Sequence, residues 1–160
     1  MMSEEVMIML TPKGHEKLRQ RLEQLRNVQR PKVAERLRES KQFGDIAENP
    51  EYEDAKQEQA LVESQVIELE RLLLLAQTIN PADIPTDHVG LGSIVTLISA
   101  DGRDEWELTL VHSVESDPDN DLISDESPVG EAVLGRKVGD EVHIHAPDGL
   151  IEYRVKSIRK

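Results

Sequence analysis

The sequence contains no cysteine, which excludes a disulfide framework and every metal site built on thiolates. Aromatic residues are almost as rare, and the complete set is Phe43, Tyr52, Trp106 and Tyr153. Nucleic-acid modules that stack bases on aromatic rings therefore have little to use. Hydrophobic runs are short, and the run at residues 6–10 is too brief for a signal peptide or a membrane span. We expect a cytoplasmic protein that does not enter a membrane.

Charge is distributed unevenly along the chain. The formal net charge of −13 opposes non-specific binding to nucleic acid over most of the surface. Residues 13–41 nevertheless hold ten Lys and Arg against four acids, a local balance of +6. Residues 43–71 hold nine acids against two basic residues, a balance of −7. These segments predict either a basic strip that is available to a partner or two helices of complementary charge that attract each other.

Residues 11–42 predict a long helix. Thr11 suits the N-cap and Pro12 suits the first helical position. The apolar side chains that share one face of this helix are Leu18, Leu22, Leu25, Val33 and Leu37. Their spacing slips in the interval that contains Arg30 and Pro31, and we therefore expect a kink or break there.

A second helix is predicted from Asn49, which suits the N-cap, with Pro50 at the first helical position. Apolar steps of three and four residues follow, as in a coiled-coil seam, at Tyr52, Ala55, Val62, Val66, Leu69, Leu73 and Ala76, with Gln59 in one position of the series. The short connection between the two helices forces them to pair antiparallel. We predict that residues 1–79 form a coiled-coil hairpin with its tip at about residues 43–49.

The second half of the chain has a different period. Residues 80–91 contain two prolines and a glycine and are predicted to be a linker. Residues 92–160 alternate with a period of two around turn signals at Asp101-Gly102 and Asp148-Gly149, and Ser127-Pro128 start a short helix. This pattern predicts a small antiparallel sheet with one short helix. The whole chain is therefore expected to be an α+β protein of two domains.

Asp45 and Glu48 are the carboxylates of the predicted tip. Asp45 resembles the first residue of a capping box, but that assignment places Pro50 at the fifth helical position, where its missing N–H interrupts the helix. If Asn49 is the N-cap, both carboxylates are spare. Two carboxylates suit a hard divalent cation but are too few to enclose it. They are either solvated turn residues or part of a metal site that another molecule completes.

Two long motifs resemble a known family. Phe-Gly-Asp-Ile-Ala-Glu-Asn-Pro-Glu-Tyr at residues 43–52, with Ala55, Lys56 and Gln59 after it, resembles the tip of the bacterial Gre transcript cleavage and elongation factors, in their GreA type. Ser-Pro-Val-Gly-Glu-Ala-Val-Leu-Gly-Arg-Lys-Val-Gly-Asp-Glu-Val at residues 127–142 resembles the C-terminal domain of that family, which has an FKBP-like fold. The resemblance extends from about residue 10 to residue 158.

The resemblance implies an accessory factor rather than an enzyme. Factors of this family insert the hairpin into the secondary channel of RNA polymerase, and we expect this chain to act there as a monomer. When the polymerase has backtracked, the tip carboxylates help to hold a second Mg²⁺, and the polymerase cleaves its own transcript. The resemblance assigns the principal metal ligand to Asp45. It assigns Glu48 to orienting the attacking water or sharing the Mg²⁺, which the polymerase completes.

Two further groups of residues are implied by the same resemblance. Lys41 and Lys56 occupy positions that face the 3′ segment of the nascent RNA, although they also suit ordinary helix-surface lysines. The segment that grips the rim helices of the polymerase corresponds to Ser124, Glu126, Ser127 and Pro128. Glu131 is a departure, because relatives often carry a basic residue there.

Two other functions remain open at this point. Some relatives occupy the same channel and inhibit transcription, but the intact Gly-Asp-x-x-Glu-Asn-x-Glu-Tyr pattern at residues 44–52 favours cleavage. A coiled-coil adaptor or dimerisation module without a catalytic role also fits the heptad seam. The acidic run at residues 115–121 indicates only a solvated loop.

Overall fold

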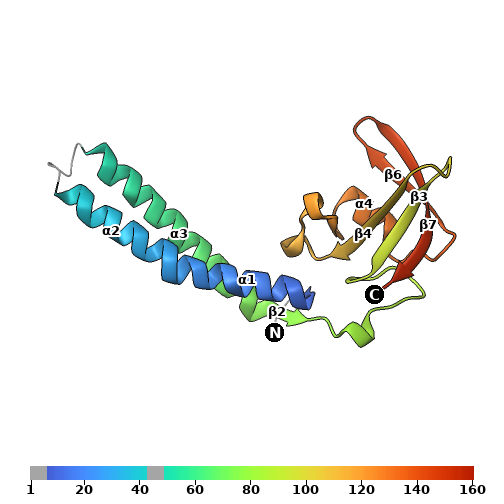
Figure 1. Cartoon of the computed structure of the whole chain (residues 1–160), viewed down its shortest axis with the longest axis horizontal. Coiled ribbons are helices and arrows are strands. Elements are labelled where there is room, and N and C mark those ends of the chain that lie inside the picture. Colours follow the sequence, from blue (N-terminus) through green and yellow to red (C-terminus); the bar gives the residue numbers. More distant parts are fainter. Residues whose placement is uncertain (1–6, 43–48) are drawn as a thin grey trace, which may run out of the picture. The chain divides into compact units, whose positions relative to one another are not determined.

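The computed structural model describes residues 7–42 and 49–160, and these form two compact units. The first unit contains His15–Ala76, and the second contains Met7–Gly14 and Gln77–Lys160. The first is a helical hairpin and the second is built around a β-sheet (Figure 1), so the expected mixed α+β class is confirmed. Within the described residues, no helix has the length and apolar character needed to cross a membrane.

The helical hairpin has two arms. One arm consists of α1 (Pro12–Gln24), a π-helical turn (Leu25–Gln29) and α2 (Arg30–Lys41), and the other is α3 (Pro50–Leu75). Ion pairs join Arg26 to Glu70 and Arg30 to Glu63, so residue numbers rise on one arm as they fall on the other. The arms therefore run antiparallel. The core between them is narrow and consists of Leu22, Leu25, Val33, Leu37, Ala55, Val62 and Val66, with Tyr52, Leu69 and Leu73 packed against it.

The irregularity expected near Pro31 is a π-helical turn, not a break. In a regular α-helix the eight residues from Leu25 to Val33 advance about 80° past two full turns, which would carry Val33 off the buried face. A π turn takes up one extra residue, so the interval behaves like seven residues and ends about 20° from the starting face. The amide of Arg30 bonds to the carbonyl of Leu25, and both Leu25 and Val33 are buried.

The second unit contains a mixed sheet in the order β5-β4-β3-β7-β6. Its elements are β3 (Ile94–Ser99), β4 (Glu105–Val111), β5 (Leu122–Ser124), α4 (Pro128–Val133), β6 (Glu141–Ala146) and β7 (Gly149–Arg159). The expected all-antiparallel sheet is wrong in one place, because β5 runs parallel to β4. The chain turns twice between these strands, with 3₁₀ turns at Ser113–Glu115 and Pro118–Asn120, so that β5 runs in the same direction as β4. A separate two-stranded ribbon pairs β1 (Ile8–Leu10) with β2 (Ala76–Thr78).

The residues predicted as a linker belong to the second unit. Val89 is fully buried in the core beneath the sheet, together with Val95, Leu97, Leu108, Leu110, Ile123, Val133, Val142, Ile144 and Val155. The amide of Val89 donates to the carbonyl of Arg136, and its carbonyl accepts from the amide of Gly135. Leu91 packs against the same core, so residues 80–91 are not a free linker although they contain two prolines and a glycine.

The turns of the sheet form as predicted. Gly102 has a φ of 74° in the β3–β4 turn, a conformation that favours glycine. The Asp101 carboxylate accepts hydrogen bonds from the Ser99 hydroxyl and the Arg103 amide, and these bonds lower the pKa of Asp101. At the other hairpin, β6 and β7 pair up to Ala146 and Gly149 across a two-residue loop.

The acidic run at residues 115–121 has structural roles that its composition does not indicate. The Asp121 carboxylate accepts a hydrogen bond of 2.9 Å from the indole of Trp106, and Asp121 has a φ of 57°. The Glu115 carboxylate accepts from both the amide of Thr11 (2.8 Å) and its hydroxyl (2.5 Å). Thr11 in turn caps the first turn of α1, since its hydroxyl oxygen accepts from the Gly14 amide. Glu115 therefore holds the start of α1 within the second unit.

The contact between Glu115 and Gly14 yields a prediction about stability. A Cβ on Gly14 would lie 1.9 Å from the Glu115 carboxylate oxygen, so an alanine there must displace the carboxylate from Thr11. We expect Gly14→Ala to destabilise the protein, because the lost charge-assisted bonds are worth about 1–3 kcal/mol. Alanine's better helix propensity, about 1 kcal/mol, offsets only part of this loss. Denaturant unfolding measures the difference.

Glu115→Ala provides the matched background for this test. Without the carboxylate, Gly14→Ala should become stabilising, because only the helix-propensity gain remains. A destabilisation of equal size in both backgrounds would show that Glu115 does not hold the helix start.

Candidate functional site

The first turn of α3 begins as the sequence predicts. Asn49 has extended dihedral angles (φ −94°, ψ 104°), and its side-chain oxygen accepts from the amides of Glu51 (3.1 Å) and Tyr52 (3.4 Å). Pro50 follows at a position where a missing N–H costs nothing. Asn49 is therefore the N-cap, and the capping-box alternative with Asp45 is not needed.

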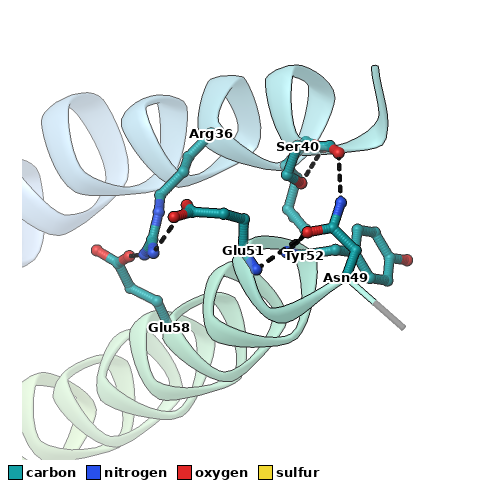
Figure 2. A network of polar contacts seen from close by, with 7 residues as sticks. Arg36, Ser40, Asn49, Glu51, Tyr52 and Glu58 are labelled. Carbon is teal, nitrogen blue, oxygen red and sulfur yellow. Dashed lines mark hydrogen bonds and ion pairs between the residues drawn. The ribbon is translucent and has the colours of Figure 1, made fainter. Parts of the chain in front are cut away.

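The Asn49 side chain also contacts the other arm of the hairpin (Figure 2). Its amide nitrogen donates a hydrogen bond of 2.7 Å to the carbonyl oxygen of Ser40, in the last turn of α2. The buried Ser40 hydroxyl donates to the carbonyl of Leu37. The last four carbonyls of a helix have no intrahelical partner, and the bond from Asn49 satisfies one of them, that of Ser40. One carboxamide thus joins the last turn of α2 to the first turn of α3.

An arginine of α2 supports the same region from the solvent side. In Figure 2, Arg36 reaches across to α3, where its guanidinium lies 2.5 Å from Glu58 and 3.9 Å from Glu51. The side chains of Arg36 and Glu58 are about two-fifths exposed, so such a pair contributes about 0.2–1 kcal/mol. The complementary charges of the two arms do pair with each other, as one of the two interpretations of the charge pattern expected.

Lys41 and Lys56 meet at Tyr52. The ammonium of Lys41 lies 5.9 Å from the centroid of the Tyr52 ring, and that of Lys56 lies 5.8 Å from it. Lys41 comes from the end of α2, whereas Lys56 is one turn beyond Tyr52 on α3. Tyr52 is half-buried and packs on the hairpin core, as predicted. Its ring also brings together the two lysines that the sequence singles out.

The two tip carboxylates, Asp45 and Glu48, lie outside the described residues. What the structure provides is the frame on both sides of them, from Ser40 and Lys41 to Asn49 and Tyr52. Within residues 7–42 and 49–160, no group of three or more His, Asp or Glu side chains is arranged to hold a metal ion. The paired histidines of β6, His143 and His145, belong to no such group.

The predicted docking residues form one hydrogen-bonded turn between β5 and α4. The Ser124 hydroxyl accepts from the amide of Glu126, and the Ser127 hydroxyl donates to the carbonyl of Ser124. Ser127 also caps α4 by accepting from the amide of Gly130. Ser124 is buried, so its role within the chain is structural, whereas Glu126 and Pro128 are exposed. The turn therefore presents Glu126 and Pro128 to solvent on a rigid support.

Gly130 makes this turn possible. A Cβ at residue 130 would lie 1.8 Å from the backbone carbonyl oxygen of Ser124, so only glycine allows α4 to approach β5 this closely. Beside it, one carboxylate oxygen of Asp125 is buried without a hydrogen-bond partner among the described residues. Neither residue is among the site residues predicted from the sequence. The Ser-Pro-x-Gly spacing was the available signal for Gly130, whereas Asp125 has none.

Sequence reasoning also did not find the bond between Asn49 and Ser40. The two residues are nine positions apart at the ends of different helices. No local sequence pattern predicts that the backbone carbonyl of a serine accepts a hydrogen bond from the side chain of an N-cap residue. The only hint was the identity of the cap. Asparagine is the N-cap residue whose side chain carries a carbonyl acceptor and an NH₂ donor together.

Two family models match the chain in order. The N-terminal model, "Transcription elongation factor, N-terminal", covers residues 8–77, and the model "Transcription elongation factor, GreA/GreB, C-term" covers residues 84–160. The two matched regions together include nearly every residue of the chain.

Individual relatives agree with these matches. Transcription elongation factor GreA of Syntrophomonas wolfei is 48% identical over 99% of this chain and 100% of its own length. GreA of Acetivibrio thermocellus is 45% identical over 96% of each chain. The crystal structure of GreA factor homolog 1 (Gfh1) of Thermus thermophilus is 31% identical, covers 96% of this chain and 99% of its own, and gives a TM-score of 0.45. The chain belongs to the GreA/GreB family of transcription elongation factors.

Proposed function

We propose that this protein stimulates RNA polymerase to cleave backtracked nascent RNA, and so returns arrested complexes to elongation. One observation carries the proposal. The family's acidic pattern, with Asp45 and Glu48, lies in the segment that joins the two arms of a helical hairpin. Ser40 and Asn49, which are nine positions apart, flank this segment and are joined by a direct hydrogen bond.

The form of the hairpin supports insertion into a narrow channel. The 26 residues of α3 extend over about 39 Å at the usual rise of an α-helix. Two paired helices are only about 20 Å across. We propose that this rod enters the secondary channel of the polymerase and brings the tip segment to the active centre.

The carboxylates suit Mg²⁺ by their chemistry. Mg²⁺ prefers hard oxygen ligands in octahedral geometry, and Asp45 and Glu48 together can fill only some of those positions. We propose that Asp45 contributes an oxygen ligand and that Glu48 shares the ion or orients the attacking water by accepting its hydrogen bond. When bound, Mg²⁺ supplies charge stabilisation to the phosphodiester undergoing hydrolysis. The remaining ligands belong to the polymerase and the RNA, so the protein is an accessory factor and the polymerase is the enzyme.

The cluster of Lys41, Tyr52 and Lys56 supports contact with RNA. Both ammonium groups are exposed and lie within 6 Å of one ring, at the base of the proposed tip. We propose that they attract the phosphates of the RNA 3′ segment, where an otherwise acidic protein needs local positive charge.

The second unit is the proposed docking module. We propose that Glu126 and Pro128, exposed on the turn that Ser124 and Ser127 stabilise, contact the rim helices of the polymerase. The five-stranded sheet with one short helix supports the FKBP-like fold that the family resemblance implies. We propose that the protein acts in the cytoplasm as a monomer that inserts its one hairpin into the channel.

An inhibitory relative is the alternative. Such a protein occupies the same channel without promoting cleavage. The intact acidic pattern of residues 44–52 favours cleavage, and the experiment below distinguishes the two functions.

The first test uses backtracked polymerase complexes that carry labelled RNA, with Mg²⁺ present. The wild-type protein should shorten the RNA from its 3′ end, and Asp45→Ala or Glu48→Ala should reduce the rate about 100-fold or more, as expected when a metal ligand or water-positioning group is removed. Glu53→Ala is the matched control, because Glu53 is an exposed acid in the first turn of α3. It should cleave like wild type.

The outcomes separate the candidate functions. Complexes that stall without cleavage would identify an inhibitor, and unchanged transcription with self-association of the protein would identify an adaptor. If Asp45→Ala, Glu48→Ala and Glu53→Ala lose activity equally, the total negative charge near the tip, and not the two named carboxylates, is responsible for cleavage.

A second test concerns Tyr52. Tyr52→Leu keeps the apolar packing but removes the ring that holds both ammonium groups, whereas Tyr52→Phe keeps the ring. We expect Tyr52→Leu to weaken crosslinking of the RNA 3′ segment and to slow cleavage roughly two- to fivefold, the equivalent of one exposed cation–π contact. Tyr52→Phe should match wild type. If both variants lose activity equally, the hydroxyl of Tyr52 and not its ring is important.

A further inference from the structure

We infer that Asn49 is a positioning residue for cleavage, and that it acts through the half of its side chain that faces α2. The cap of α3 uses the Asn49 oxygen alone, whereas the Asn49 nitrogen bonds to the Ser40 carbonyl. The inference rests on the proposed function, since it concerns how the tip carboxylates are held.

The geometry of this bond indicates more than helix capping. The distance of 2.7 Å from the Asn49 nitrogen to the Ser40 oxygen is shorter than either capping bond. Ser40 is 4% exposed, so water has little access to replace the bond. A serine, threonine or aspartate N-cap could start α3 equally well, but none of them carries an acceptor and an NH₂ donor together. The carboxamide meets both requirements at once.

The location of the bond explains why it matters for the tip. α2 ends at Lys41 and α3 begins at Pro50, so the Asn49–Ser40 bond joins the two ends of the connecting segment. Asp45 and Glu48 lie between these ends in the sequence. Among the described side chains near this end, the ion pairs between the arms are exposed, and Arg36 makes them with Glu58 at 2.5 Å and with Glu51 at 3.9 Å. A misplacement of about 1 Å in a catalytic group can cost about 100-fold in rate.

The substitution Asn49→Asp isolates the donor half of the side chain. Aspartate is nearly isosteric, keeps the oxygen that caps α3, and places negative charge at a helix N-terminus, where it is favourable. It has no N–H for Ser40, and its second oxygen faces the Ser40 carbonyl instead. The cap is therefore preserved and the bond between the arms is lost.

The chain contains a matched control. Asn80 also precedes a proline, has similar dihedral angles (φ −73°, ψ 123°), and accepts a capping bond of 3.0 Å from the amide of Ala82. Within the part of the chain that the structure describes, its side-chain nitrogen makes no hydrogen bond corresponding to that from Asn49 to Ser40. Asn80→Asp therefore makes the same chemical change at an N-cap without breaking a bond between helices.

The experiment measures RNA cleavage in backtracked polymerase complexes over a range of Mg²⁺ concentrations, for wild type, Asn49→Asp and Asn80→Asp. We expect Asn49→Asp to lower the maximal rate about tenfold or more and to raise the Mg²⁺ concentration needed for half-maximal cleavage, because displaced carboxylates share the ion less well. Its thermal midpoint should fall by only a few degrees, as expected for one lost hydrogen bond, so that the protein stays folded in the assay, and its competition for polymerase should stay close to wild type. Asn80→Asp should match wild type in every measurement.

A second measurement does not depend on cleavage. In the NMR spectrum of the wild-type protein, the side-chain NH₂ protons of Asn49 should exchange with solvent more slowly than those of Asn80, because only the former donate to a buried carbonyl. Equal exchange rates would overturn the inference.

The outcomes for the inference and for the proposed function are distinct. If wild type cleaves and Asn49→Asp cleaves equally well with the same Mg²⁺ dependence, the inference is overturned and the proposed function stands. If the Asn49→Asp defect is matched by loss of folding or of polymerase binding, the residue is merely structural and the inference is again overturned. Absence of cleavage by wild type refutes the proposed function itself.

Discussion

The first unit depends on keeping two helices in register along a seam one side chain wide. Its core contains only small and medium apolar residues, so a shift of either helix by part of a turn would expose the whole set. The π-helical turn at Leu25–Gln29 preserves this register, because it accommodates one residue more than a regular helix would allow. The same register brings Arg26, Arg30 and Arg36 opposite their carboxylate partners. It also brings the last turn of α2 to Asn49.

The polar contacts at the two ends of the arm that contains α1 and α2 have a different role from the ion pairs along it. The ion pairs between the arms are exposed, and each is worth little to stability. The contacts at the ends are less exposed and join elements that are distant in sequence. Glu115 holds Thr11 at the start of α1, and Asn49 holds Ser40 at the end of α2. In both cases one side chain serves a helix terminus and a second element together, so a single residue couples local structure to tertiary structure.

These contacts show what many of the acidic side chains of the chain do. Acids along α3 neutralise the basic strip of the other arm, Glu115 and Asp121 bind a helix start and an indole, and Asp101 stabilises a turn. These carboxylates are engaged within the chain. Asp45 and Glu48 are distinguished by the family pattern in which they lie and by the fact that the cap of α3 does not need them.

The sequence by itself determined the features that depend on neighbours along the chain. Thr11, Asn49 and Ser127 cap their helices as predicted, the heptad spacing identified the seam, and Gly102 marked its turn, because capping, periodicity and φ preference are local. Tertiary structure decided the features that need a distant partner. The π turn keeps the seam against α3, β5 runs parallel to β4 because the chain turns twice between them, and Val89 is buried because it packs into the core of the second unit. The bond from Asn49 to Ser40 also needs a distant partner. The sequence supplies the asparagine, but only the pairing of the helices brings the Ser40 carbonyl to the side-chain NH₂ group of Asn49.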